Sequence, residues 1–272
     1  MRTLKHLLIS VLLATPSWNS FAADLDEAAS EPELAEYSPS DVGSGWYLRG
    51  DVGYAFLADM DAVTRRISGA GSPPVEEAFE DARLDERFSG GLGVGYQAND
   101  YLRADLTADL FKTEFNAEGG AGGLCAYAFA GADCRSFENA NLTALSLLAN
   151  VYVDLGTFVG FTPYVGAGAG ASYVKWDDLT SRLHCVQGGC GGASDAMVVQ
   201  NGQSDWRFTY ALAAGVAYDV ADDLKIDLGY RFKDVSGGDA FGSMDGPGPT
   251  AIEGSDKGYR LHEVRVGLRY DL

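Results

Sequence analysis

Charged side chains that could act as acids, bases or ion-binding groups recur at every second position in several segments of this chain. In the stretch SGWYLRGDVGY, Arg49 and Asp51 alternate with the apolar residues Leu48 and Val52. Across the chain, such polar faces carry seven cations and seven carboxylates: Arg49, Arg103, Lys225, Arg231, Lys233, Arg265 and Arg269, with Asp51, Asp105, Asp109, Asp154, Asp227, Glu263 and Asp271. Equal numbers of both signs indicate a neutralised ion-pair network, because a buried charge is costly unless it is paired.

Histidine, the usual general base of hydrolases and acyltransferases, is scarce here. His6 belongs to the N-terminal leader, His184 to a Gly-rich connection, and His262 to the apolar face of the last alternating segment. None of them can therefore join a serine and a carboxylate in a catalytic triad. Asp105 and Asp109 share one face, which leaves a carboxylate-only mechanism open, although the cations around them are expected to neutralise both. We expect no enzyme activity and no cofactor.

The four cysteines occur as two local pairs, each within one Gly-rich stretch. An even number of cysteines in an exported protein favours disulfide bonds, with three possible connectivities. Because of the local spacing we expect Cys125 to pair with Cys134 and Cys185 with Cys190. A metal site built from His184 and the two later cysteines is disfavoured, since the spacing matches no common ligand set.

Strands with two different faces must position these charges, because a period of two is the signature of a β-strand. The pattern appears in eight segments: residues 44–54, 88–97, 101–110, 141–154, 162–174, 206–219, 224–233 and 261–272. Their apolar faces carry large aromatic residues near the segment ends, such as Trp46, Tyr96, Tyr173 and Trp206. Aromatic residues at these places are typical of the interfacial girdles of membrane barrels.

The connections between these segments alternate in length. Three are short, while the other four cover residues 57–87, 114–140, 176–205 and 236–257. Loops of that length are unusual in a compact soluble domain but common on the outer side of outer-membrane barrels. We therefore predict an all-β fold: an eight-stranded antiparallel transmembrane β-barrel with short periplasmic turns, long extracellular loops and both termini in the periplasm. A soluble β-sandwich is the alternative.

The chain divides into three parts by composition. Residues 1–22 read as a secretory signal peptide, with Arg2 and Lys5 before a short apolar run. Residues 23–43 are acidic and without periodicity, as in a flexible tail, and residues 44–272 form the barrel domain. The net charge of −19 excludes the basic footprint that nucleic-acid binding needs.

The segments GWYLRGDVGYAF, YLRADLTADL, TPYVGAGAGASYV and VRVGLRYDL together resemble the opacity-type, porin-like outer-membrane β-barrel family of alphaproteobacteria. The resemblance covers residues 45–272. In the tail, Arg265, Gly267, Tyr270 and Leu272 match the family's C-terminal insertion signal, with Leu272 where phenylalanine is usual. The resemblance implies recognition of this tail by the barrel-assembly machinery of a Gram-negative outer membrane.

The sequence leaves three functions open. We expect a structural or surface-interacting role, with lipid and lipopolysaccharide as surroundings and an extracellular ligand of the loops as a possible partner. The alternative is a porin-like channel, because glycines on the inner face of the second and fifth segments could leave room for water. An outer-membrane lipid-modifying enzyme is the third hypothesis.

Overall fold

The computed structural model describes residues 45–68, 74–120, 124–125, 128–129, 132–188, 194–244 and 251–272. The signal peptide and the acidic tail predicted from the sequence lie outside these residues. Within the described part of the chain there is no helix long and apolar enough to cross a membrane.

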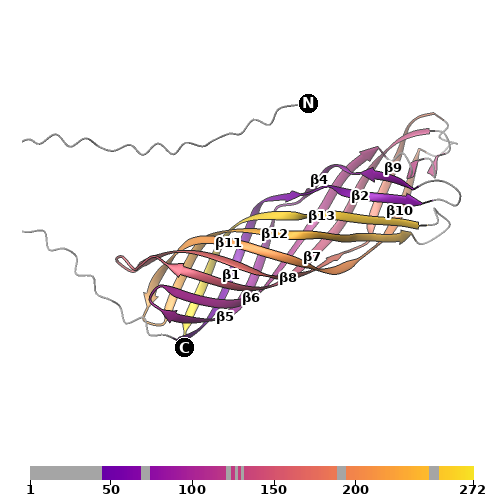
Figure 1. Ribbon diagram of the computed structural model, residues 1–272. Coiled ribbons are helices and arrows are strands. Elements are labelled where there is room, and N and C mark those ends of the chain that lie inside the picture. Colours follow the sequence, from indigo (N-terminus) through magenta and orange to yellow (C-terminus); the bar gives the residue numbers. More distant parts are fainter. Residues whose placement is uncertain are drawn as a thin grey trace, which may run out of the picture. The chain divides into compact units, whose positions relative to one another are not determined.

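Eight antiparallel strands close into a barrel (Figure 1). In their order around the barrel they are β1 (Gly45–Met60), β5 (Arg87–Asn99), β6 (Leu102–Gly120), β7 (Ala132–Asp154), β8 (Phe161–Trp176), β11 (Ser204–Ala221), β12 (Leu224–Met244) and β13 (Ala251–Asp271). Each strand pairs with the next, and β13 pairs with β1 to complete the cylinder. The predicted eight-stranded antiparallel barrel is confirmed. Closure leaves no open strand edge where the barrel contacts lipid, where unpaired backbone groups would be costly.

The two ends of the barrel differ. One end holds the short turns at residues 100–101, 155–160 and 222–223, together with the C-terminus (Figure 1). We call it the turn end, and the opposite end the extended end. These turns lie where the alternating sequence pattern breaks, so the prediction of three short connections is also confirmed.

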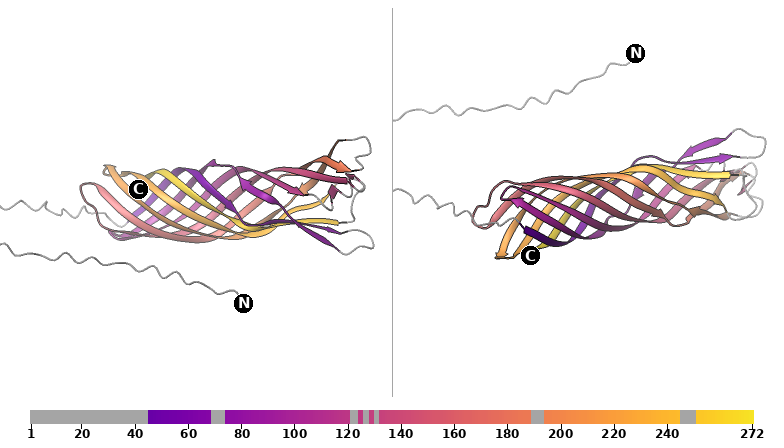
Figure 2. Two further views of the ribbon diagram at one scale, coloured as in Figure 1. Left: turned by 90° about the horizontal axis from the view of Figure 1, so that it is seen from above. Right: turned by 60° about the horizontal axis from the view of Figure 1, so that its bottom comes forward.

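The four long connections are not loops for most of their length. They contain β2 (Val63–Ser68), β3 (Val75–Ala78), β4 (Glu80–Leu84), β9 (Leu179–Gly188) and β10 (Asp195–Gly202), and the outer parts of β6, β7, β12 and β13. The connections are long, as predicted, but their strands were not expected: β2 continues the pairing of β1 along β13, and β9 continues that of β8 along β7. Figure 2 shows these strands prolonging the barrel at the extended end. We call this prolongation the extended tier.

A belt of apolar side chains surrounds the barrel between the turn end and the extended tier. Leu92, Leu106 and Val266 expose 73%, 63% and 53% of their surface. Neighbouring strands pair aromatic rings at both borders of the belt, with Trp46 and Tyr96 on the turn-end side and Tyr173 and Trp206 on the other. So large an apolar surface is unsuited to water and suited to lipid.

Candidate functional site

The lumen inside the belt is filled with ion pairs, and Asp109 lies at their centre. Its two carboxylate oxygens accept hydrogen bonds from Arg231 Nη1 at 2.9 Å and Arg265 Nη2 at 2.7 Å. Arg231 also binds Glu263 at 2.7 Å, and Arg265 forms an ion pair with Asp51. These charges come from β1, β6, β12 and β13, so the contacts run across the barrel as well as between neighbouring strands.

A second group of polar side chains surrounds Asp105. Arg49 Nη1 donates a hydrogen bond to this carboxylate at 2.9 Å, and the Tyr47 hydroxyl donates another at 3.2 Å. Asn150 Nδ2 lies 2.7 Å from the other oxygen. Asp105 is 4% exposed, and its hydrogen bonds offset the cost of removing the charge from water.

The remaining predicted charges, apart from Lys233, lie toward the turn end. Arg103 Nε binds Asp154 at 3.0 Å, and its guanidinium stacks over the rings of Tyr152 and Tyr164. The rest of this region is formed by two further pairs: Arg269 Nε lies 3.9 Å from Asp227, and Lys225 binds Asp271 at 3.0 Å. All fourteen predicted side chains are thus buried in the lumen or partly buried at its rim.

Lys233 is the predicted cation that the structure does not pair directly. Its Nζ is buried and makes no hydrogen bond within the described part of the chain. It lies 6.0 Å from the centre of the Phe111 ring, at the border between the ionic network and an apolar region. An ammonium over an aromatic face gains a cation–π attraction, which partly offsets its burial.

Several glycines on the inner faces of β5 and β8 are covered by large side chains from neighbouring strands. Gly95 is the direct cross-strand partner of Tyr47, and Gly166 is that of Tyr152. A Cβ atom on either glycine would overlap the partner's ring. A cavity of about 30 Å³ remains beside Arg49, which is space for about one or two water molecules. Gly95 and Gly166 therefore accommodate large side chains from neighbouring strands and leave no open space at these two positions.

Replacing Gly95 with valine is expected to destabilise the barrel by about 1–3 kcal/mol, because the new side chain would displace the Tyr47 ring within a filled lumen. Urea unfolding in phospholipid vesicles, followed by tryptophan fluorescence, measures the change. Gly90→Val is the matched control on the same strand, since a Cβ at Gly90 meets its nearest atom at 4.0 Å. Equal stability of the two variants would contradict the assignment.

An apolar core closes the lumen above the ionic network, toward the extended end. Phe115 of β6, Trp176 of β8 and Phe241 of β12 meet there, and each is at most 1% exposed. The ring centres of Phe115 and Trp176 are 5.3 Å apart, and those of Trp176 and Phe241 are 5.0 Å apart. Because these rings come from three separate strands, they pack against one another across the interior of the barrel.

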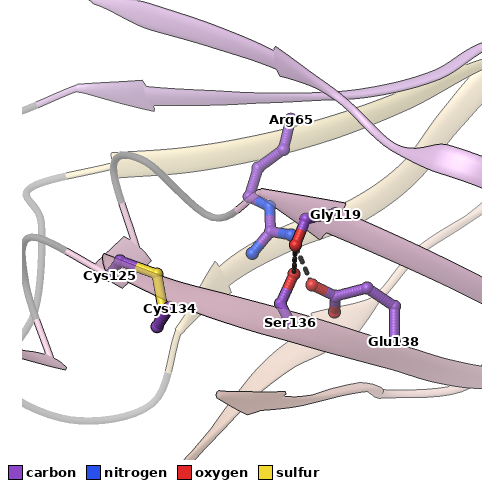
Figure 3. The surroundings of a disulfide bond; sticks show 6 residues. All are labelled: Arg65, Gly119, Cys125, Cys134, Ser136 and Glu138. Carbon is purple, nitrogen blue, oxygen red and sulfur yellow. Dashed lines mark hydrogen bonds and ion pairs between the residues drawn. A yellow bond between two sulfur atoms is a disulfide. The ribbon is translucent and has the colours of Figure 1, made fainter. Parts of the chain in front are cut away.

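Two buried ion pairs toward the extended end were not predicted from the sequence. Arg65 of β2 binds Glu138 of β7 at 2.8 Å (Figure 3). Ser181 donates a hydrogen bond to the same carboxylate. Arg65 lies in what we expected to be a loop. Val63, Arg65 and Ile67 occupy every second position and are buried, which is the pattern of a strand. The pattern was not recognised because one of the three inward residues is charged.

The other missed pair joins Arg207 of β11 to Asp256 of β13. Arg207 Nη1 lies 2.8 Å from both oxygens of Asp256, and its Nε binds Asp205 at 2.7 Å. Burial raises the pKa of Asp256, although Arg207 opposes the shift. The sequence did contain a signal for this pair. Arg207 and Thr209 are two residues apart in the segment 206–219, so both side chains lie on its inner face.

A disulfide bond stabilises the outermost part of the tier. Cys125 and Cys134, which we expected to pair, are joined, with their Cα atoms 5.8 Å apart (Figure 3). Cys185 is also disulfide-bonded and lies opposite Cys134 on the neighbouring strand. Its expected partner, Cys190, lies outside the described residues. Around these cysteines a second apolar core contains Ile67, Leu124, Phe129, Leu183, Val198 and Ile252.

The two described histidines lie outside the lumen. His184 is exposed in the extended tier and binds Asp195 at 2.6 Å. His262 lies in the outer aromatic border, with its Nδ1 2.6 Å from the Tyr230 hydroxyl. Among the described residues no group of three or more His, Cys, Asp and Glu side chains could hold a metal ion.

The residues of the predicted insertion signal lie at the end of β13. Arg265 points into the lumen, while Tyr270 is 51% exposed on the lipid side. The backbone at Gly267 passes close to the side chain of Asp51, and the Leu272 amide donates a hydrogen bond to the Trp46 carbonyl at 2.9 Å. The last strand therefore also closes the barrel, and its role as a signal stays a prediction.

Comparison with known proteins places this chain among outer-membrane barrels. A family profile described as "Outer membrane protein beta-barrel domain" matches residues 28–271. An uncharacterized protein of Brucella suis biovar 1 (strain 1330) is 36% identical, with 93% of each chain covered. A protein of Rickettsia bellii (strain OSU 85-389), named as a candidate adhesin, is 28% identical and covers 86% of this chain and 91% of its own. The crystal structure of the outer membrane protein OprG from Pseudomonas aeruginosa is 16% identical with a TM-score of 0.48, covering 84% of this chain and 97% of that one.

A closed barrel with a lipid-facing belt and a charged interior defines the class of integral outer-membrane β-barrel proteins. This chain belongs to the outer membrane protein β-barrel domain family. It is a protein of the Gram-negative outer membrane.

Proposed function

We propose that this protein is a non-conducting anchor that presents its extended tier as a rigid interaction surface outside the cell. The observation that carries the proposal is the filled lumen. Ion pairs occupy the belt region, and Phe115, Trp176 and Phe241 pack against one another above it. A barrel that does not conduct would serve to hold the extended tier above the membrane.

Several features support an exposed location for the extended tier. It contains a disulfide bond, which is compatible with the cell exterior and also with the periplasm, since both are oxidising. Short turns on one side and long hairpins on the other follow the usual orientation of outer-membrane barrels, with the turn end and both termini in the periplasm. The name of the Rickettsia relative is consistent with a surface role. Lipid and lipopolysaccharide would contact the belt, and the barrel-assembly machinery would recognise the end of β13.

Planar-bilayer recording tests the absence of a channel. The purified full chain is expected to give no stable unitary conductance at either polarity, because ion pairs and the rings of Phe115, Trp176 and Phe241 occupy the lumen. A purified trimeric porin inserted under the same conditions is the positive control. Stable conductance steps that a bulky substitution at Gly93 or Gly168 abolishes would refute the proposal and favour a pore.

The orientation is tested by labelling intact cells with a membrane-impermeant amine reagent. Lys257, an exposed side chain of the extended tier, is expected to be modified, while Lys225 at the turn end is protected. Peptide mass spectrometry identifies the labelled sites, with permeabilised cells as the control. Labelling of Lys225 alone in intact cells would reverse the proposed orientation.

A further inference from the structure

The outer wall of the extended tier carries an apolar patch that no lipid would cover. Phe137 of β7 and Val186 of β9 expose 45% and 60% of their surface, and Met197 of β10 exposes 68%. Phe137 lies eight residues beyond Leu145, the nearest lipid-facing leucine of β7. At a rise of about 3.3 Å per residue and a tilt of about 40°, that distance is about 20 Å above the belt. The patch therefore faces the aqueous side of the lipid headgroups.

The patch includes a hollow of about 460 Å³ over the junction of β9 and β10. Phe137, Arg182 and Met197 line it, together with the His184–Asp195 pair. We call these five residues the β9–β10 face. Aromatic residues, methionine and arginine are the types enriched at the centres of protein–protein interfaces.

The face carries charges of both signs on adjacent strands. Arg182 lies directly opposite Met197 across the strand pair, and His184 lies opposite Asp195. Within the described residues Arg182 makes no hydrogen bond or ion pair, so its guanidinium remains available. The Asp195 side chain is 70% exposed, and hydrogen bonds from His184 and Ser194 lower its pKa, which keeps it ionised near neutral pH. A carboxylate with two engaged oxygens can still accept a further donor.

We propose that the β9–β10 face binds the same face of a second copy of this chain. A two-fold axis along the membrane normal, over the junction of β9 and β10, would place Arg182 of each copy against Asp195 and Met197 of the other. Such an interface is isologous, so each contact occurs twice. All copies in one membrane have the same orientation relative to the bilayer. A two-fold axis that relates two of them must therefore be parallel to the membrane normal.

Electrostatics favours this face over other surfaces for self-association. The chain as a whole has a net charge of −19, so most pairings of its surfaces bring like charges together. At physiological salt the Debye length is about 8 Å, and copies in contact therefore respond mainly to the charges of the touching faces. The β9–β10 face offers both a cation and an anion, and it is complementary to itself.

A charge-exchange experiment tests the proposal in liposomes that contain only the full-length protein. Copies with two different affinity tags are reconstituted together, and association is measured by co-purification after chemical crosslinking. Arg182→Glu and Asp195→Arg are each expected to reduce association of identical copies at least tenfold, because like charges then meet twice. Mixing the two variants is expected to restore association, since each altered charge again faces its opposite. Arg66→Glu, a matched change at an exposed position of β2, should have no effect.

Folding of every variant is checked by the mobility shift of unheated samples on SDS gels. If Arg182→Glu fails to fold, Met197→Asp replaces it and is expected to abolish association as well. A wild-type protein that remains monomeric, or a mixture that does not recover, would overturn the proposal. Crosslinking of the face to a different protein in whole cells, without a homodimer, would also overturn it. The conductance of the protein in planar bilayers is independent of these outcomes.

Discussion

Replacing Asp109 with alanine should cost the folded barrel about 3–5 kcal/mol, the usual cost of breaking a buried ion pair from one side. Asp109 is 1% exposed and holds two guanidiniums, those of Arg231 and Arg265, at 2.9 and 2.7 Å. Removing the carboxylate leaves one unbalanced positive charge in the lumen, where Arg231 keeps only Glu263 and Arg265 only Asp51 as ion-pair partners. The free energy of unfolding in urea, measured in phospholipid vesicles, gives the size of the loss.

The matched control for this prediction is Asp85→Ala. Asp85 also pairs with an arginine, Arg87, at 3.3 Å, but both side chains are more than one third exposed. An exposed pair of this kind contributes about 0–1 kcal/mol. If Asp109→Ala were no more destabilising than Asp85→Ala, the lumenal ion pairs would be dispensable for folding, and their assigned role in stabilising the barrel would be wrong.

Replacing Phe115 with alanine is expected to destabilise the protein by about 3–5 kcal/mol, as for other buried phenylalanines. Its side chain is 0% exposed and contacts Trp176 and Phe241 in the apolar core that closes the lumen. The substitution removes apolar contacts and leaves a cavity among rings held by three different strands. Those strands belong to a closed sheet and have little freedom to collapse around it.

Phe158→Ala serves as the control for Phe115→Ala, because Phe158 is 63% exposed in the short turn between β7 and β8. Its loss should change the free energy of unfolding by at most about 0.5 kcal/mol, as for most surface positions. Unfolding curves of both variants, recorded under the same conditions, decide the comparison. Equal effects would mean that the aromatic core is loosely packed and does not seal the lumen.

The alternating pattern of the sequence determined which side chains face inward within the membrane. A charge turned toward lipid at the midplane costs about 2–4 kcal/mol for arginine or lysine, so the register of a segment such as 101–110 has one acceptable setting. Composition and spacing also determined the three short turns, the number of strands and the pairing of Cys125 with Cys134. Each of these properties depends on neighbours in the chain, which a sequence displays directly.

Only the tertiary structure decided which inward charges meet. Arg49 of β1 reaches Asp105 of β6, and Arg231 of β12 reaches Asp109 of the same strand. These strands are not neighbours in the sheet, and their side chains meet because the sheet is closed into a narrow cylinder. Whether Gly95 leaves space or is covered was likewise decided by its partner Tyr47 on β1.

The extended tier was also decided by tertiary structure. Its strands carry inward charges such as Arg65 and Glu138, which obscure the alternation that identified the strands of the belt. Outside the bilayer no lipid penalises a polar outer face or rewards an apolar one, so the pattern that enforces orientation within the membrane is weaker there. These segments form strands because the ends of the barrel strands offer unpaired backbone groups to which they can bond.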